Sequence, residues 1–307
     1  MTNPDLPFRS LSQESRRRLI EMGPHWTEDI VANREMVLDA YTPVLASRPR
    51  EDIEVARELR YGPHPRHRLD IYRRPGANAA PVLAFVHGGA FIRGEKDVTS
   101  QIYGNVTRYF ARRDCVGVNI EYRLASEAPY PGGAQDVAAA IRWIRANIAR
   151  YGGSAERIVL AGHSAGAAHA GAYVCDPVAN PAGDDGLAGL ALVSGRLRAD
   201  VHDDNPNAPG VRAYYGADET LYDARSVVTH AANLRTPVFI AVAEHENPWL
   251  DVYSAEMAYR VGRQTKRLPI FVQLPGQTHT SMVAHFDAGE ELLDRALLEF
   301  VRSVTRA

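Results

Sequence analysis

Short segments of uninterrupted hydrophobic residues recur along the chain, with helical patterns between them. These segments cover residues 82–86, 115–120, 158–161, 190–193, 238–242 and 270–274. A strand that is hydrophobic at every position is typical of a parallel sheet covered on both faces. Because strands of this kind alternate with helices, the chain is predicted to form an α/β fold with a mostly parallel, doubly wound sheet.

Two earlier segments show a different pattern. Residues 51–60 and 68–72 partly alternate between hydrophobic and polar positions, and Gly62-Pro63-His64-Pro65 separates them. Alternation predicts strands with one solvated face, and a short Gly- and Pro-containing connection predicts a hairpin. We therefore expect antiparallel strands at the N-terminal edge of the sheet.

The clearest helix is predicted over residues 135–150. Its hydrophobic residues recur at helical spacing, and Gly152-Gly153 provides an end signal. Those hydrophobic positions are Val137, Ala140, Ile141, Ile144 and Ile148. Residues 198–225 are instead polar and rich in Asp, Asn and Pro, so we expect a long surface excursion there.

Residues 1–50 predict two helices ahead of the sheet. Ser12 is placed to cap the first helix, and Gly23-Pro24 ends it. The second is predicted over residues 27–41, with Pro43 interrupting it. Two short helices are marginal in isolation, so residues 1–50 are expected to form a helical cap over a catalytic domain of residues 51–307.

Composition narrows the class of protein. The 307 residues are 45% hydrophobic and 23% charged, with a formal net charge of −2, which is typical of a globular protein with no general affinity for nucleic acid or membranes. Residues 1–10 lack a signal-peptide core, and no segment is long and apolar enough to span a membrane. Cys115 and Cys175 are expected to be buried free thiols, which favours a cytoplasmic location. A homodimer is the assembly that we would test first.

The best candidate for chemistry is Gly162-His163-Ser164-Ala165-Gly166. It lies between a predicted strand and a segment of small residues that is predicted to be a helix. A strand, a Gly-x-Ser-x-Gly turn and a helix together indicate a nucleophile elbow, in which a strained turn presents the serine hydroxyl at a helix N-terminus. Ser164 is therefore the predicted nucleophile.

A serine nucleophile needs a histidine base and an acid that orients the histidine. In proteins with this elbow the order along the chain is serine, acid, histidine. His279 follows the last hydrophobic strand and is the predicted base. Glu246 is the favoured acid, with Asp251 and Glu244 as alternatives, because all three follow the strand at 238–242.

Ester or amide cleavage also creates an oxyanion that needs N–H donors. The sequence Val86-His87-Gly88-Gly89-Ala90-Phe91 follows the first long hydrophobic strand. Its two glycines let the backbone approach a substrate closely. We therefore predict that the backbone N–H groups of Gly88, Gly89 and Ala165 form an oxyanion hole.

Taken together, these motifs resemble those of α/β-hydrolases, specifically the hormone-sensitive-lipase-like esterases and the nearby kynurenine-formamidase-like esterases. The matching positions, within residues 50–305, are His87-Gly88-Gly89-Ala90-Phe91, Glu121-Tyr122-Arg123-Leu124, Pro131 with Asp136, the Ser164 pentapeptide and Ala243-Glu244-His245-Glu246. The resemblance implies that the N-terminal helices line the acyl pocket. Two departures are that this family usually has aspartate at the position of Glu246 and a third glycine at that of Ala90.

The function expected from these residues is that of a serine carboxylesterase, which hydrolyses small to medium esters through an acyl-enzyme. No metal-ligand spacing or phosphate-binding loop is present, so neither a metal nor an organic cofactor is expected. Phe91, Trp26 and Tyr214 are candidates for contact with a small-molecule ester substrate. The alternatives are an amide hydrolase of the arylformamidase type and a non-catalytic ligand-binding homologue.

Overall fold

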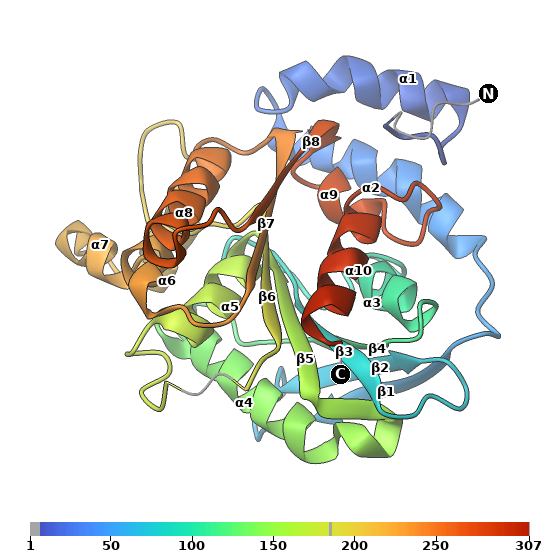
Figure 1. Ribbon diagram of the computed structural model, residues 1–307. Helices are drawn as coiled ribbons and strands as arrows, with labels where there is room; N and C mark the ends of the chain where they lie inside the picture. Colours follow the sequence, from blue (N-terminus) through green and yellow to red (C-terminus); the bar gives the residue numbers. More distant parts are fainter. Residues whose placement is uncertain (1–6, 184–185, 307) are drawn as a thin grey trace.

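A mostly parallel sheet of eight strands forms the centre of the described part of the chain, in the order β1-β2-β4-β3-β5-β6-β7-β8 (Figure 1). The computed structural model describes residues 7–183 and 186–306. The strands are β1 (Glu54–Arg60), β2 (Arg68–Arg73), β3 (Ala80–Val86), β4 (Val116–Ile120), β5 (Gly153–His163), β6 (Gly189–Val193), β7 (Val238–His245) and β8 (Ile270–Thr278). Strand β2 is antiparallel to β1 and β4, and the other pairs are parallel. The predicted α/β fold with an antiparallel N-terminal edge is confirmed.

Helices cover both faces of the sheet (Figure 1). They are α1 (Gln13–Met22), α2 (Ile30–Ala46), α3 (Gly104–Ala111), α4 (Gly132–Asn147), α5 (Ala165–Cys175), α6 (Ala208–Tyr215), α7 (Tyr222–Arg225), α8 (Leu250–Thr265), α9 (Ser281–Ala284) and α10 (Leu293–Val304). Helices α4, α5 and α8 contribute to the hydrophobic core on one face, and α3, α9 and α10 to the core on the other. No helix in the described residues has the length and hydropathy needed to cross a bilayer.

The alternation of side chains along β3 explains why its strand is hydrophobic throughout. Val82, Ala84 and Val86 belong to the core beneath α4 and α5. Leu83 and Phe85 belong to the core beneath α3 and α10. Successive side chains of a strand point to opposite faces, so a strand between two helical layers needs hydrophobic residues at every position.

Strand β8 departs from this expectation. It pairs only with β7 at the outer edge of the sheet, and Ile270 is 47% exposed. The prediction that residues 270–274 are covered on both faces is therefore wrong. The helical layers extend only partly over this edge, so a hydrophobic segment does not by itself reveal full burial.

Residues 198–225 are more ordered than their composition predicted. They contain α6 and α7, and α6 buries Val211, Tyr214 and Tyr215 in the hydrophobic core. The expectation of a surface excursion is correct only in part, because Asp200 and Asn205 are buried as well. The buried aromatic side chains anchor this segment because they remove a large apolar area from water.

The N-terminal helices pack against the core that contains α9. Ser12 caps α1 as predicted, and its hydroxyl accepts a hydrogen bond from Ser15 N–H. Helix α2, however, continues through Pro43 to Ala46. The predicted interruption is wrong, because the buried face of Val37, Tyr41 and Leu45 runs past the proline. The packing of this face offsets the cost of the one backbone hydrogen bond that the helix loses at the proline.

Candidate active site

Ser164 lies at the junction of β5 and α5 in a strained conformation, with φ 57° and ψ −119°. Glycine is required on both sides of it. A Cβ on Gly162 would stand 2.4 Å from the Gly166 carbonyl oxygen, and one on Gly166 would stand 2.2 Å from that of Val86. The crowding shows why only glycine fits two positions before and after the serine. The predicted elbow geometry is therefore present.

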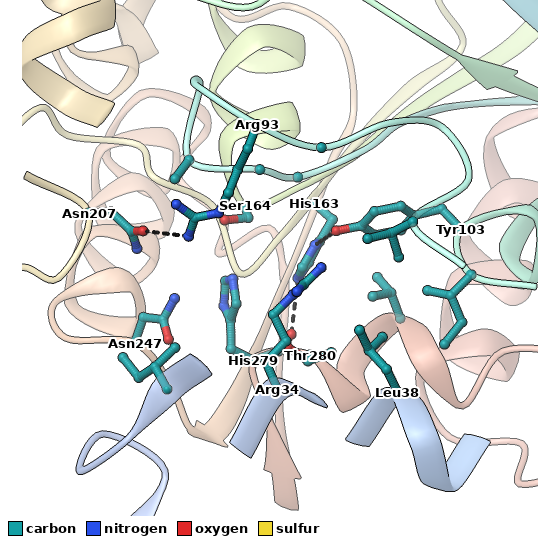
Figure 2. Close-up of a pocket in the computed structure, with 18 of the residues that line it drawn as sticks. Arg34, Leu38, Arg93, Tyr103, His163, Ser164, Asn207, Asn247, His279 and Thr280 are labelled. Atoms are coloured by element: carbon teal, nitrogen blue, oxygen red, sulfur yellow. Dashed lines mark hydrogen bonds between the residues drawn. The ribbon is translucent and has the colours of Figure 1, made fainter. Parts of the chain in front are cut away.

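His279 follows β8 and lines the same pocket as Ser164. Figure 2 shows its imidazole directed toward the serine. Its backbone carbonyl contacts Nε2 of His163 at 3.0 Å, and its own N–H donates to the carbonyl of His245. These contacts join the loop after β8 to the elbow and to the end of β7. The two side chains that the sequence assigned as nucleophile and base thus converge.

Glu246 is the carboxylate that reaches His279. Its Oε2 lies 2.7 Å from Nδ1 of the imidazole, and both side chains are largely buried. The alternative acids face elsewhere: Glu244 accepts the N–H of Gly276, and Asp251 accepts the N–H of Val252 at the start of α8. The geometry therefore favours Glu246 over Asp251 and Glu244 as the partner of the histidine.

His163 is held neutral beside this pair. Burial, together with the neighbouring His279, keeps the pKa of His163 well below its usual range. A neutral imidazole has one donor nitrogen and one acceptor nitrogen. Since Nε2 faces the carbonyl of His279, this nitrogen carries the proton, and Nδ1 is left to face the hydroxyl of Tyr103 at 3.5 Å.

The loop that follows β3 supplies backbone groups next to the serine. Gly88 and Gly89 line the pocket, and a Cβ added to Gly88 would stand 3.0 Å from Cβ of Ser164. Ala165 is the first residue of α5, immediately after the serine. The three candidate donors of the oxyanion hole are therefore adjacent to Ser164, at a helix N-terminus that favours negative charge.

Residues of the predicted family motifs hold this loop in place. Glu121 accepts hydrogen bonds from the Lys96 N–H at 2.8 Å and from Nε2 of His87 at 2.9 Å, and it pairs with Arg66. The hydroxyl of Tyr122 donates to the His87 carbonyl at 3.0 Å. The motif at 121–124 thus positions the backbone that carries Gly88 and Gly89.

The pocket has a volume of about 140 Å³. Trp26, Ile30, Arg34 and Leu38 of the N-terminal segment form part of its wall, so this segment covers the site. Trp26 also donates from Nε1 to Asn247 Oδ1 at 2.8 Å, next to Glu246. Trp26 thus lines the pocket, and its contact with substrate stays a prediction.

Phe91 and Tyr214 lie outside this pocket. Their rings stack on one another with centroids 4.7 Å apart, and both pack on His169 within the hydrophobic core. We therefore remove them from the residues expected to contact substrate. Phe91 follows the glycine loop closely, but its side chain points into the core beneath that loop.

Several pocket residues were not identified from the sequence. Arg34, Arg93, Tyr103, Asn207, Asn247 and Thr280 line the pocket (Figure 2). They come from α2, from loops and from the region around α3, far apart along the chain. Of these residues, only Asn247 and Thr280 could have been suggested by the sequence, because they directly follow Glu246 and His279.

Comparisons with known proteins agree with the fold and the motifs. The model of the BD-FAE family matches residues 69–174. Esterase LipC of Mycobacterium tuberculosis is 39% identical over 126 residues, which are 39% of this chain and 30% of LipC. A probable isoprenylcysteine alpha-carbonyl methylesterase of Arabidopsis thaliana, ICMEL1, is 27% identical over 72% of this chain and 43% of its own length. The chain thus spans less than half the length of these two curated relatives.

Solved structures extend the likeness over nearly the whole chain. A bacterial heroin esterase has a TM-score of 0.71 at 21% identity, covering 98% of this chain and 99% of its own. Esterase B of Lactobacillus rhamnosis has a TM-score of 0.72 at 19% identity, covering 96% and 97%. The chain has the α/β-hydrolase fold, and the matches confirm its resemblance to the hormone-sensitive-lipase-like esterases.

Proposed function

We propose that this protein is a serine carboxylesterase that hydrolyses small esters through an acyl-enzyme. The observation that carries the proposal is the meeting of Ser164 and His279 in one pocket, with Glu246 bound to Nδ1 of the histidine. Relatives that are named esterases support the same class of reaction. A pocket of about 140 Å³ supports substrates with a small group at the reacting carbon.

In the proposed mechanism, Oγ of Ser164 attacks the ester carbonyl carbon while Nε2 of His279 takes the hydroxyl proton. The backbone N–H groups of Gly88, Gly89 and Ala165 stabilise the resulting oxyanion. The bond to the alcohol oxygen then breaks, and the imidazolium donates its proton to that oxygen. The acyl group remains on Ser164.

Water completes the cycle. His279 removes a proton from a water molecule, the resulting nucleophile attacks the acyl carbon, and the serine leaves with the proton returned by the imidazolium. Glu246 holds the ring in the tautomer that presents Nε2 as a base, and its charge stabilises the imidazolium in both halves of the reaction. Removal of that charge is therefore expected to slow both steps.

The proposal is tested with p-nitrophenyl esters of increasing acyl length. Ser164→Ala should lower kcat about a million-fold, as is found when a triad nucleophile is removed, whereas the exposed Ser303→Ala should leave it unchanged. A fluorophosphonate probe should label the wild type but not Ser164→Ala. Retained turnover in Ser164→Ala would refute the assignment, and absence of labelling in the wild type would favour a non-catalytic ligand-binding protein. Parallel assays with N-formylkynurenine separate an ester from an arylformamide preference.

A further inference from the structure

Two arginine side chains project into the pocket from different elements. Arg34 comes from α2 in the N-terminal segment, and Arg93 from the loop after β3. Figure 2 shows both guanidinium groups directed toward the space around Ser164 and His279. A pocket that binds an uncharged ester does not require positively charged side chains. Hydrolysis of such esters therefore does not explain the presence of Arg34 and Arg93.

Among the described residues, neither guanidinium has a carboxylate partner. Within residues 7–183 and 186–306, no carboxylate forms an ion pair with Arg34 or Arg93, and the polar contact of Arg93 is a long one of 3.4 Å to Oδ1 of Asn207. Arg34 is half-buried and part of Arg93 remains exposed, whereas the half-buried Arg123 and Arg198 are paired with Asp136 and Glu256. Glu246, which adjoins the pocket residue Asn247, is already bound to His279.

The two charges also act on each other. Loss of contact with water, and to a smaller extent the proximity of Arg34, lowers the pKa of Arg93. Two like charges that share a confined site repel, and partial removal from water adds a cost for each charge. An anion between them would reverse both effects, and the planar guanidinium matches a carboxylate through two parallel hydrogen bonds.

We propose that the pocket selects esters that also carry a carboxylate, and that Arg34 and Arg93 bind this carboxylate. The proposal rests on the esterase function above and names its substrate class. Trp26, Leu38, Val98 and Val283 provide the apolar wall for the hydrocarbon part of such a molecule. The pocket volume of about 140 Å³ limits the group enclosed there to a few carbon atoms, on the scale of a cavity that holds one benzene ring.

The test compares esters that differ only in charge. Monomethyl glutarate and its amide, methyl 5-amino-5-oxopentanoate, place the charge on the acyl side. The pair 4-acetoxybenzoate and 4-acetoxybenzamide places it on the alcohol side. In one of the two pairs, kcat/KM should be about ten- to a hundredfold higher for the carboxylate, the range expected for charge-assisted hydrogen bonds. Added salt should reduce this preference because it screens partly exposed charges.

Variants assign the preference to the two arginines. Arg34→Gln and Arg93→Gln should each lower the ratio of kcat/KM for the charged over the neutral ester by about tenfold. Arg34→Lys keeps the charge but loses the planar pair of donors, so it should retain part of the preference. The matched control is Arg18→Gln, an exposed arginine of α1 outside the pocket, which should keep the full ratio.

The outcomes separate this proposal from the proposed function. If Ser164-dependent hydrolysis of the neutral esters is robust but neither pair favours the carboxylate, the substrate class is wrong and the esterase function stands. A preference that survives in both glutamine variants would likewise overturn the role of the arginines. If neither these esters nor p-nitrophenyl acetate is hydrolysed, the esterase function fails and the substrate class fails with it.

Discussion

Oε2 of Glu246 lies 2.7 Å from Nδ1 of His279, and backbone hydrogen bonds hold the carboxylate in this position. Its Oε1 accepts the N–H of Ala243 at 3.0 Å, and Oε2 also accepts the N–H of Asn247 at 3.2 Å. Three donors therefore converge on one largely buried carboxylate. A carboxylate has acceptor sites for all three donors, and its negative charge would suit a role in stabilising an imidazolium.

Replacement of Glu246 by glutamine is expected to lower kcat about ten-thousand-fold, by analogy with the acid of other triads. The amide can donate to Nδ1 and so favour the wrong tautomer of His279, and it carries no charge. Steady-state kinetics with a p-nitrophenyl ester measure this effect. Asp251→Asn and Glu244→Gln are the matched controls, because neither side chain contacts His279. A larger loss in either control would identify a different acid.

Gly88→Ala is expected to lower kcat about a hundredfold or more, the scale of losing one oxyanion donor. The new methyl group would stand 3.0 Å from both Cβ of Ser164 and Nδ1 of His163, so the loop must shift away from the serine. The control is Gly262→Ala in α8, where the nearest atom lies 3.5 Å away. That variant should keep its activity and gain up to about 1 kcal/mol in free energy of unfolding. Unchanged kinetics in Gly88→Ala would contradict a role for this loop in the reaction.

His169 is expected to make the fold sensitive to acid. It is 1% exposed between aromatic rings, and burial lowers its pKa to about 3. Because the folded pKa lies below the ordinary value of about 6.5, the unfolded chain takes up a proton that the folded protein refuses. The stabilisation from the neutral ring is therefore complete above about pH 6.5 and is lost as the pH falls toward about 3.

Urea unfolding at pH 7.5, 6 and 5 measures this contribution. One proton corresponds to about 1.4 kcal/mol per pH unit, so the free energy of unfolding of His169→Gln should fall less steeply with acid than that of the wild type, by up to this amount. The exposed His25 provides the control, since His25→Gln should leave the slope unchanged. Equal slopes for His169→Gln and the wild type would contradict the assignment.

Tyr41→Phe is expected to destabilise the fold by about 2 kcal/mol. Its hydroxyl donates to Oε1 of the fully buried Glu290 at 2.8 Å, and the same carboxylate accepts from Phe8 N–H and from Ser10 Oγ. The variant removes one of the donors to the Glu290 carboxylate, which links this C-terminal residue to the N-terminal segment. Thermal or urea unfolding checks the loss, with Tyr259→Phe, which is 62% exposed, as the neutral comparison.

The sequence was most informative about local structure. The hydrophobic strands and the hairpin edge form close to their predicted positions, because each depends on periodicity within a short segment. The helix predicted over residues 135–150 forms as α4 over Gly132–Asn147, and a 3-10 turn over Ile148–Tyr151 separates it from Gly152. The errors at β8, at Pro43 and in residues 198–225 share one cause. In each case the outcome depended on how neighbouring elements pack, and the pattern along the chain does not report that packing.

The Ser164 elbow and the positions of the candidate acid and histidine after later strands could be predicted from the sequence, because a tight turn needs glycines and each side chain follows its own strand. The choice of Glu246 over Asp251 and Glu244 needed tertiary structure, since a few residues of turn geometry decide which carboxylate reaches His279. The burial of Phe91 and the placement of Arg34 and Arg93 around one pocket likewise depend on the folded chain. A local steric requirement, such as that of a tight turn, determines which residue types stand beside it in the sequence. Contacts between distant segments form only when the whole core has packed.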